Sequence, residues 1–276
     1  MRRTLVLALA CALVPLPALA SAHPGGRPGE AFTFKFSVGP IESGRARMSV
    51  GLPTTRAGRR LVAVHGQAET AKWLQLMVRL DDDYRLVYDA ATLLPVEVVS
   101  VERGVRERRI ASKVDGRRAD IDVQAKRDAG RARRTLPNVV RDPLSALFAL
   151  RAAPLADGAR LGLDVLDGAA LWRVRLEVHR GEKVRLERDG DDARSRVAIR
   201  VDGELRRIDD LGRELGGAPR HLQVWLSDDA ERLLLLVEGD TDLGRASLEL
   251  TSYTPPPGAP RRREPAPSLP GLAPLP

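Results

Sequence analysis

The chain contains a single cysteine, Cys11, among its 276 residues, and this residue lies close to the N-terminus. We expect cleavage of a leader segment to remove it, which leaves a mature protein without cysteine. Disulfide bonds, thiol catalysis and metal sites built on cysteine are then excluded. The folded part must therefore be held together by the packing of apolar strands.

Aromatic residues and lysines are also few. There are four phenylalanines, three tryptophans and three tyrosines, and only five of the 45 basic residues are lysines. The remaining positive charge is arginine, spread along the chain and interleaved with 37 acids. A nucleic-acid-binding protein concentrates positive charge on one face and provides stacking aromatic side chains. The composition therefore argues against nucleic acid as a partner and favours a solvated surface that faces anionic envelope polymers or lipid head groups.

Long hydrophobic runs are absent except at the N-terminus. The uncharged run over residues 5–19 follows two arginines and leads into small residues that suit a signal peptidase. At about 15 residues it is shorter than the roughly 20 that a membrane-spanning helix needs. The pattern predicts a signal peptide over residues 1–20, cleaved after Ala20 or after Ala22.

A lipid anchor is one alternative for this segment, because Ala8–Cys11 has the form of a lipobox. A lipobox closes the apolar core of its signal, whereas here the apolar run continues to Leu19. An uncleaved membrane anchor is a second alternative, weakened by Pro15 and Pro17, which break the last turn of a helix. We expect a soluble exported protein, periplasmic or secreted, whose membrane association is peripheral at most.

Composition divides the remaining chain into three parts. Residues 21–28 are rich in glycine and proline and predict a linker, and residues 29–253 predict one β domain. Residues 254–276 are dominated by proline, alanine and glycine, with the basic stretch Arg261–Arg263. Such a segment cannot bury enough apolar surface to order itself, so we predict a disordered tail.

A period of two dominates the β domain. Apolar and polar residues alternate over residues 32–38 and again over 46–50, with a Gly39–Pro40 turn between them, which predicts a β-hairpin. The alternation recurs to the end of the domain, and turn signals such as Asp167–Gly168 and Asp202–Gly203 fall between its segments. Short strands with one polar face indicate a meandering antiparallel sheet instead of βαβ units.

One segment, residues 142–151, has the period of a helix. Asp142 suits the N-cap and Pro143 the first helical position. An apolar face and a terminal arginine follow at helical spacing, made of Leu144, Leu147, Phe148 and Arg151. We predict a helix that packs its apolar face on the sheet, with Asp142 and Arg151 stabilising its two ends electrostatically.

The order of these landmarks resembles that of a bacterial envelope family, domain of unknown function 3108. The matching segments are the opening Gly29–Phe34 and Gly39–Ala46, the turn Asp89–Pro95, the central helix start Asp142–Leu147, the hairpin segment Val224–Asp229 with Trp225, and the last strand with Gly244, Leu248, Leu250 and Tyr253. Leu234 departs from the pattern, since proline is expected there.

The resemblance covers roughly residues 29–253. It implies a mainly β protein of the periplasm or outer envelope, built as an open antiparallel half-barrel, a spiral-like sheet, with one central helix packed on its concave face. Trp225 then has a structural role. The resemblance implies no reaction, because none is assigned to the family.

No residue pattern predicts a catalytic, metal or cofactor site. The histidines His23, His65, His179 and His221 have no second ligand nearby, and the acidic runs Asp81–Asp83 and Asp228–Asp229 lack the spacing of a calcium loop. Ser145 on the predicted helix has no neighbouring base. An enzyme would need acids from distant strands to converge, such as Glu97 or Glu177 with Glu249.

We therefore expect a non-catalytic envelope protein that binds a lipid, a polymer segment or another apolar ligand in the concave sheet. The alternative is a structural or assembly partner of another envelope protein, in which an open sheet edge accepts a second chain. The third hypothesis is a hydrolase that acts on an envelope polymer.

Overall fold

The structure is a computed structural model, and it describes residues 25–74, 80–104, 107–127, 129–186, 194–241, 244–257 and 269–275. The predicted signal peptide, its cleavage site at Ala20 and the first residues of the predicted linker lie outside these ranges. No helix in the described ranges has the length and apolar character needed to cross a membrane.

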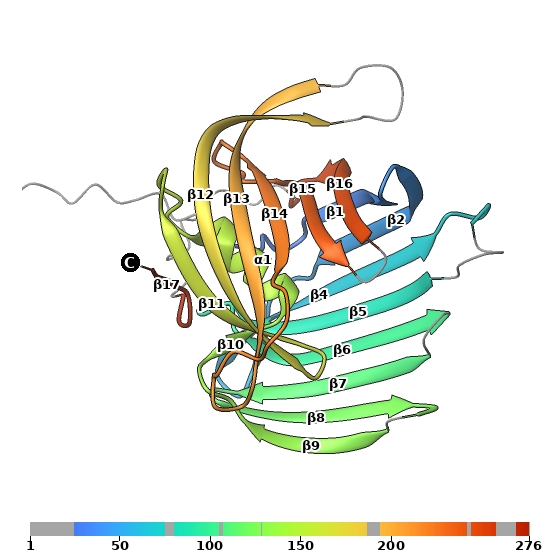
Figure 1. The fold of residues 1–276 in the computed structure, drawn as a ribbon, viewed down its shortest axis with the longest axis vertical. Helices are drawn as coiled ribbons and strands as arrows, with labels where there is room; N and C mark the ends of the chain where they lie inside the picture. The colour runs from blue at the N-terminus through green and yellow to red at the C-terminus, as the bar shows by residue number, and fades with distance from the viewer. Residues whose placement is uncertain are drawn as a thin grey trace, which may run out of the picture.

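The described chain forms one helix and a 17-stranded sheet (Figure 1). The helix is α1 (Pro143–Ala152). The strands are β1 (Ala31–Val38), β2 (Ile41–Val50), β3 (Thr54–Arg56), β4 (Arg59–Thr70), β5 (Leu80–Asp89), β6 (Pro95–Gly104), β7 (Arg108–Asp115), β8 (Arg118–Ala125), β9 (Gly130–Thr135), β10 (Val140–Arg141), β11 (Arg160–Asp167), β12 (Ala170–Leu186), β13 (Arg194–Ile208), β14 (Arg220–Ser227), β15 (Leu234–Thr241), β16 (Gly244–Thr254) and β17 (Ala273–Pro274).

The sheet is an antiparallel meander with β1 near its middle. This strand pairs with β2 on one side and with β16 on the other. From β2 the sheet continues through β4 to β9, and from β16 it continues back through β15 to β11. The short β10 is parallel to β11. No pairing in the described ranges joins β9 to β10 or β11, so the sheet is open, as predicted.

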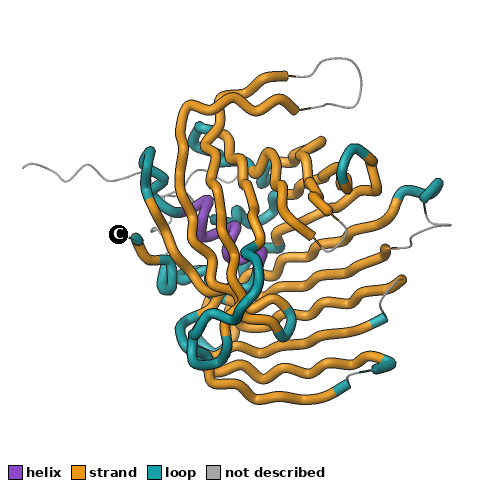
Figure 2. Tube along the Cα trace, viewed as in Figure 1, coloured by secondary structure: helices purple, strands orange, loops and turns teal. Residues whose placement is uncertain are grey.

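The main core lies between the helix and the concave face of the sheet, which we call the inner face. Figure 2 shows α1 inside the curve of the sheet. Phe148 of α1 is 1% exposed, and its ring lies 5.7 Å from the ring of Tyr88 on β5. Val174 and Val178 of β12 belong to the same buried cluster. The helix is therefore packed between the two halves of the curved sheet.

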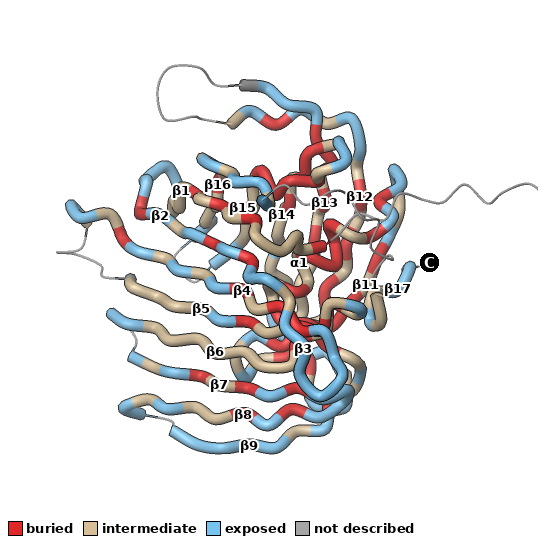
Figure 3. The backbone as a smooth tube through the Cα atoms, turned by 180° about the vertical axis from the view of Figure 1, so that it is seen from behind, coloured by how far each residue is buried: buried red, intermediate tan, exposed pale blue. Residues whose placement is uncertain are grey.

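A second, smaller core shows that the sheet is a spiral. Leu166, Leu171 and Ile208, at adjoining ends of β11, β12 and β13, are buried together with Ile110 and Ile121 of β7 and β8. One end of the sheet thus packs across the other instead of pairing with it edge to edge. In Figure 3 burial is concentrated around α1 and at the neighbouring ends of β7 and β8, while β9 is largely exposed.

Two predictions from the sequence are wrong. Asp202–Gly203 is not a turn, because it lies within β13. A Cβ at Gly203 would lie 3.1 Å from Leu176 and 3.2 Å from Leu222, so the glycine serves close packing between strands. The second error concerns part of the tail: residues 269–275 are ordered against β11, where β17 forms. Residues 258–268 lie outside the described ranges.

Candidate functional site

Asp142 is the N-cap of α1, as predicted. Its carboxylate accepts hydrogen bonds from the backbone N–H of Leu144 at 2.9 Å and of Ser145 at 3.2 Å, and the Ser145 hydroxyl accepts one from the Asp142 N–H at 3.0 Å. The hydroxyl of Tyr84 on β5 also donates to Asp142, at 3.2 Å. Burial is the main cause that raises the pKa of Asp142. The residue therefore ties the helix start to the inner face of the sheet.

Arg151 lies in the last turn of α1, and its side chain binds groups outside the helix. Its guanidinium donates to both carboxylate oxygens of Glu30, at 2.7 and 3.2 Å, and to the backbone oxygen of Arg232 at 2.9 Å. Arg151 is 2% exposed and Glu30 0%. Arg151 lies in the last turn, as predicted, and its main contact is a buried ion pair between α1 and the start of β1, which the sequence did not predict.

The other predicted structural residues differ in how deeply they are buried. Pro143 occupies the first turn, as predicted. Leu144 and Leu147 are only partly buried, whereas Phe148 is fully buried. Trp225 of β14 lies on the outer face of the sheet, where the guanidinium of Arg200 sits 5.7 Å from its ring.

The acids named from the sequence do not converge. Their partners lie on the outer face: Glu97 pairs with Arg56, Glu177 with Arg160, and Glu249 with Lys35. The three described histidines each lie near one aspartate (His65 with Asp83, His179 with Asp202, His221 with Asp240). In the ranges that the structure describes, no group of three or more histidine, cysteine or acidic side chains is arranged to hold a metal ion.

Charged side chains meet instead on the inner face, in a group that we call the inner charged cluster: Asp82 on β5, Glu102 on β6, Arg108 on β7 and Asp167 at the end of β11. Asp82 stands opposite Glu102, and Glu102 stands opposite Arg108, in the strand register. Arg108 donates to Glu102 at 2.5 Å. The spiral brings the turn after Asp167 over β7, where a Cβ at Gly168 would lie 3.0 Å from Ile110.

The electrostatics of this cluster are unusual for surface acids. Burial, together with the charges of Glu102 and Asp81, raises the pKa of Asp82 to about 6. Asp167 keeps contact with water, yet the protein around it raises its pKa as well, against the attraction of Arg108. Asp82 and Asp167 therefore take up protons at a higher pH than ordinary aspartates do.

An aromatic and cationic group lies beside the cluster. Trp172 of β12 is flanked by two guanidinium groups, Arg207 at 5.3 Å and Arg220 at 5.2 Å from its ring. Arg220 also attracts Asp167 electrostatically, which links the two groups. The adjoining inner wall carries apolar side chains that are only partly buried, namely Leu205, Leu222, Val237 and Leu248. Both signs of charge therefore border an apolar surface that water can reach.

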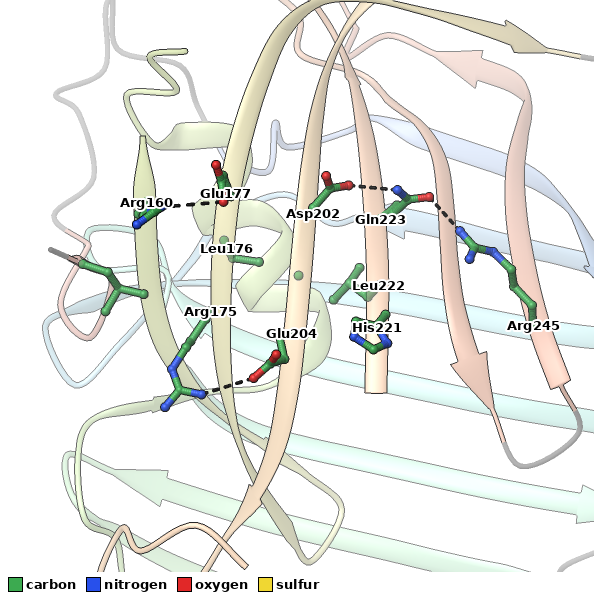
Figure 4. Close-up of a pocket in the computed structure, with 12 residues that line it drawn as sticks. Arg160, Arg175, Leu176, Glu177, Asp202, Glu204, His221, Leu222, Gln223 and Arg245 are labelled. Carbon is green, nitrogen blue, oxygen red and sulfur yellow. Dashed lines mark hydrogen bonds and ion pairs between the residues drawn. The ribbon is translucent and has the colours of Figure 1, made fainter. Parts of the chain in front are cut away.

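The outer face of the same strands carries a groove of about 760 Å³. Figure 4 shows Glu177, Asp202 and Gln223 in a row across β12, β13 and β14, with Arg245 beyond them. These groups bind one another: Gln223 donates to Asp202 at 2.9 Å and accepts from Arg245 at 2.6 Å. We interpret the groove as a solvated ladder of cross-strand pairs, and it is a weaker candidate than the inner face.

Sequence reasoning missed the inner charged cluster. Asp81–Asp83 was visible as an acidic run and Asp167–Gly168 as a turn signal, but nothing local joins them. A sign was available in the alternation of β5, which places Asp82 on the same face as Tyr84 and Leu86. An acid on an apolar face is a candidate for a perturbed group.

Comparisons with known proteins give a family. Among solved structures, the chain is similar to a beta-barrel-like protein of domain of unknown function DUF1849 from Brucella abortus, with 11% identity and a TM-score of 0.49 over 83% of this chain and 98% of that one. No curated protein matches the sequence. The model of the family described as "Protein of unknown function (DUF3108)" matches residues 32–251. Because this match spans most of the sequence, the resemblance is confirmed and the chain belongs to the DUF3108 family.

Proposed function

We propose that this is an exported, non-catalytic envelope protein that binds an amphiphilic ligand on the inner face of its spiral sheet. The observation that carries the proposal is the meeting of the inner charged cluster with a partly exposed apolar wall. A lipid or a lipid-linked polymer segment has this combination of an apolar part and a charged head.

The charges favour a head group that carries both signs. Asp82, Glu102 and Asp167 would face an ammonium group, and Arg108 and Arg220 would face a phosphate or a carboxylate. Trp172 provides a flat apolar surface between them and the aliphatic side chains of β13 and β14. The residues that take part come from both ends of the spiral, so the site exists only in the folded sheet.

Export is the second part of the proposal, and it rests on the sequence of residues 1–22. A basic start, an uncharged run and small residues at the expected cleavage position match the pattern of a signal peptide. N-terminal sequencing of the protein from its own cells tests this directly, because a chain that starts at residue 21 or 23 is expected. A mature protein that still begins at Met1 would contradict export by this route.

The ligand is tested by native mass spectrometry of the protein purified from its own envelope fraction. We expect bound mass in the range of a lipid, which is lost in organic solvent. A titration with lysophosphatidylethanolamine, followed by tryptophan fluorescence, then measures affinity. A bare protein mass together with no response to the lipid would overturn the proposal.

Two tryptophans supply a matched pair of variants. Trp172 lies on the inner face and Trp225 on the outer face, and each stacks with arginine. Trp172→Ala is expected to weaken lipid binding at least tenfold, while Trp225→Ala leaves it unchanged. Equal losses in both variants would indicate a general effect on folding, and equal affinities would place the ligand elsewhere.

A further inference from the structure

The edge of β11 is covered by the end of the chain itself. In β17, Ala273 stands opposite Gly162 and Pro274 opposite Leu161, in antiparallel register. The backbone N–H of Leu275 donates to the carbonyl of Arg160 at 2.9 Å, which extends the pairing by one bond. Residues 269–275 thus complete an edge that otherwise offers unpaired backbone groups to any extended chain.

Side-chain packing adds to the backbone pairing, in a space beside Gly162 that we call the leucine seat. A Cβ at Gly162 would lie 2.9 Å from Cδ2 of Leu275, so the missing side chain makes room for this leucine. Leu269 and Leu272 pack, partly buried, against the main core. The bound segment is therefore uncharged, is extended at residues 273–274, and is packed against the protein through Leu269, Leu272 and Leu275.

A buried arginine fixes the same segment. Arg141 is 0% exposed and donates to the carbonyl oxygens of Leu93 at 2.8 Å and of Pro270 at 2.9 Å. The loss of the segment would therefore remove one acceptor from a buried guanidinium. Because this acceptor is a backbone carbonyl, a segment of another sequence can provide it when its backbone follows the same path, including the turn at Pro270 and Gly271.

The pairing is short, since β17 has only two residues. A turn precedes it, in which the N–H of Leu272 donates to the carbonyl of Leu269 at 3.2 Å and Gly271 has a φ of 78°. β10 occupies the next part of the same edge, opposite Asp164 and Val165, so an added segment pairs with residues 160–162 of β11. A pairing this short is one that a segment of another protein can displace. Strand addition to an exposed edge is a general mode of peptide recognition.

We propose that the edge of β11 is a strand-acceptor site, which residues 269–275 occupy within the chain and which an extended, uncharged, leucine-bearing segment of a partner protein binds by displacing them. The site lies apart from the inner charged cluster, so it does not depend on ligand binding there. The protein thereby gains a surface for assembly with another chain. Its own C-terminal segment controls whether this surface is open.

The experiment uses the full chain and a fluorescent peptide with the sequence of residues 269–276. Leu272→Asp with Leu275→Asp removes the chain's own leucines from their seats, and circular dichroism checks that the fold is kept. We expect the peptide to bind this opened variant at least tenfold more tightly than the unaltered protein. Adding Gly162→Val, which fills the leucine seat, is expected to abolish this gain.

A folded opened variant that does not bind the peptide would overturn the proposal, and so would binding that Gly162→Val leaves unchanged. A second variant covers the case in which the opened protein does not fold. In Arg160→Cys with Leu275→Cys, a disulfide holds the segment on the edge. The reduced form is expected to bind the peptide at least tenfold more tightly than the oxidised form, and equal binding counts against the site.

Discussion

The two ends of α1 each carry a fully buried arginine, and the two are stabilised in different ways. Arg151, at the helix end, forms a bidentate ion pair with Glu30. Arg141, just before the helix, donates among the described residues to backbone carbonyls, and burial lowers its pKa to about 10. A carboxylate is hydrogen-bonded to the first guanidinium, whereas the second donates to carbonyl groups and is attracted to Asp142 only through space. The comparison shows that a buried cation can join chain segments with or without a hydrogen-bonded carboxylate.

The largest effect is expected from breaking the ion pair at the helix end. Glu30→Gln leaves the guanidinium of Arg151 buried without a counter-charge, and the expected loss in the free energy of unfolding is about 3–5 kcal/mol. Urea denaturation measures it. The double variant Glu30→Gln with Arg151→Met removes both charges and is expected to recover part of the loss. A single variant as stable as the unaltered protein would show that the pair contributes little.

A smaller effect is expected at the other end of the helix. Arg141→Met removes the cation and leaves carbonyl groups unpaired but no stranded charge, so we expect a loss of about 1–3 kcal/mol. Arg141→Lys is not expected to restore it, because an ammonium group cannot reach both carbonyls with the planar geometry of a guanidinium. If Arg141→Met costs as much as Glu30→Gln, the contrast between the two arginines fails.

Asp142 sharpens the comparison at the helix start. Asp142→Ala removes the cap, and the expected loss is about 1 kcal/mol, measured by thermal or urea unfolding. Asp142→Asn keeps an oxygen for the backbone N–H groups and is expected to lose less. A melt unchanged by Asp142→Ala would contradict the capping role.

The smallest effect is a pH dependence in the inner charged cluster. Because the pKa of Asp82 is raised to about 6 in the folded state, folding favours its protonated form. Its contribution to stability is full below pH 4 and is lost as the pH rises from about 4 through 6. Asp82→Asn is therefore expected to melt a few degrees higher than the unaltered protein at pH 7 but not at pH 4.

Asp120 on β8 is the control for this titration. The hydrogen bond from Arg133 holds its pKa below the usual range, so its contribution has the opposite sign. It is present above the ordinary pKa and is lost as the pH falls. Asp120→Asn is expected to lower the melting temperature slightly at pH 7. A shift of the same sign for both variants would contradict the assigned electrostatics.

Much of the fold follows from local patterns in the sequence. The alternation over residues 32–50 predicts the hairpin that β1 and β2 form, and the cap and period of residues 142–151 predict α1. These features depend on neighbours within a few residues, so single-residue chemistry determines them. The same reasoning wrongly placed Gly203 in a turn, because the role of this glycine is set by Leu176 and Leu222 on other strands.

By itself, the sequence determined the class of the fold, its helix and its family, because strand period, helix cap and turn residues act over short range. Only the tertiary structure decided which distant groups meet. The pairing of Arg151 with Glu30 joins residues 121 positions apart, and the meeting of Asp167 with Arg108 depends on how tightly the spiral coils. Curvature and register add up over many strands, and no single segment of the sequence contains them.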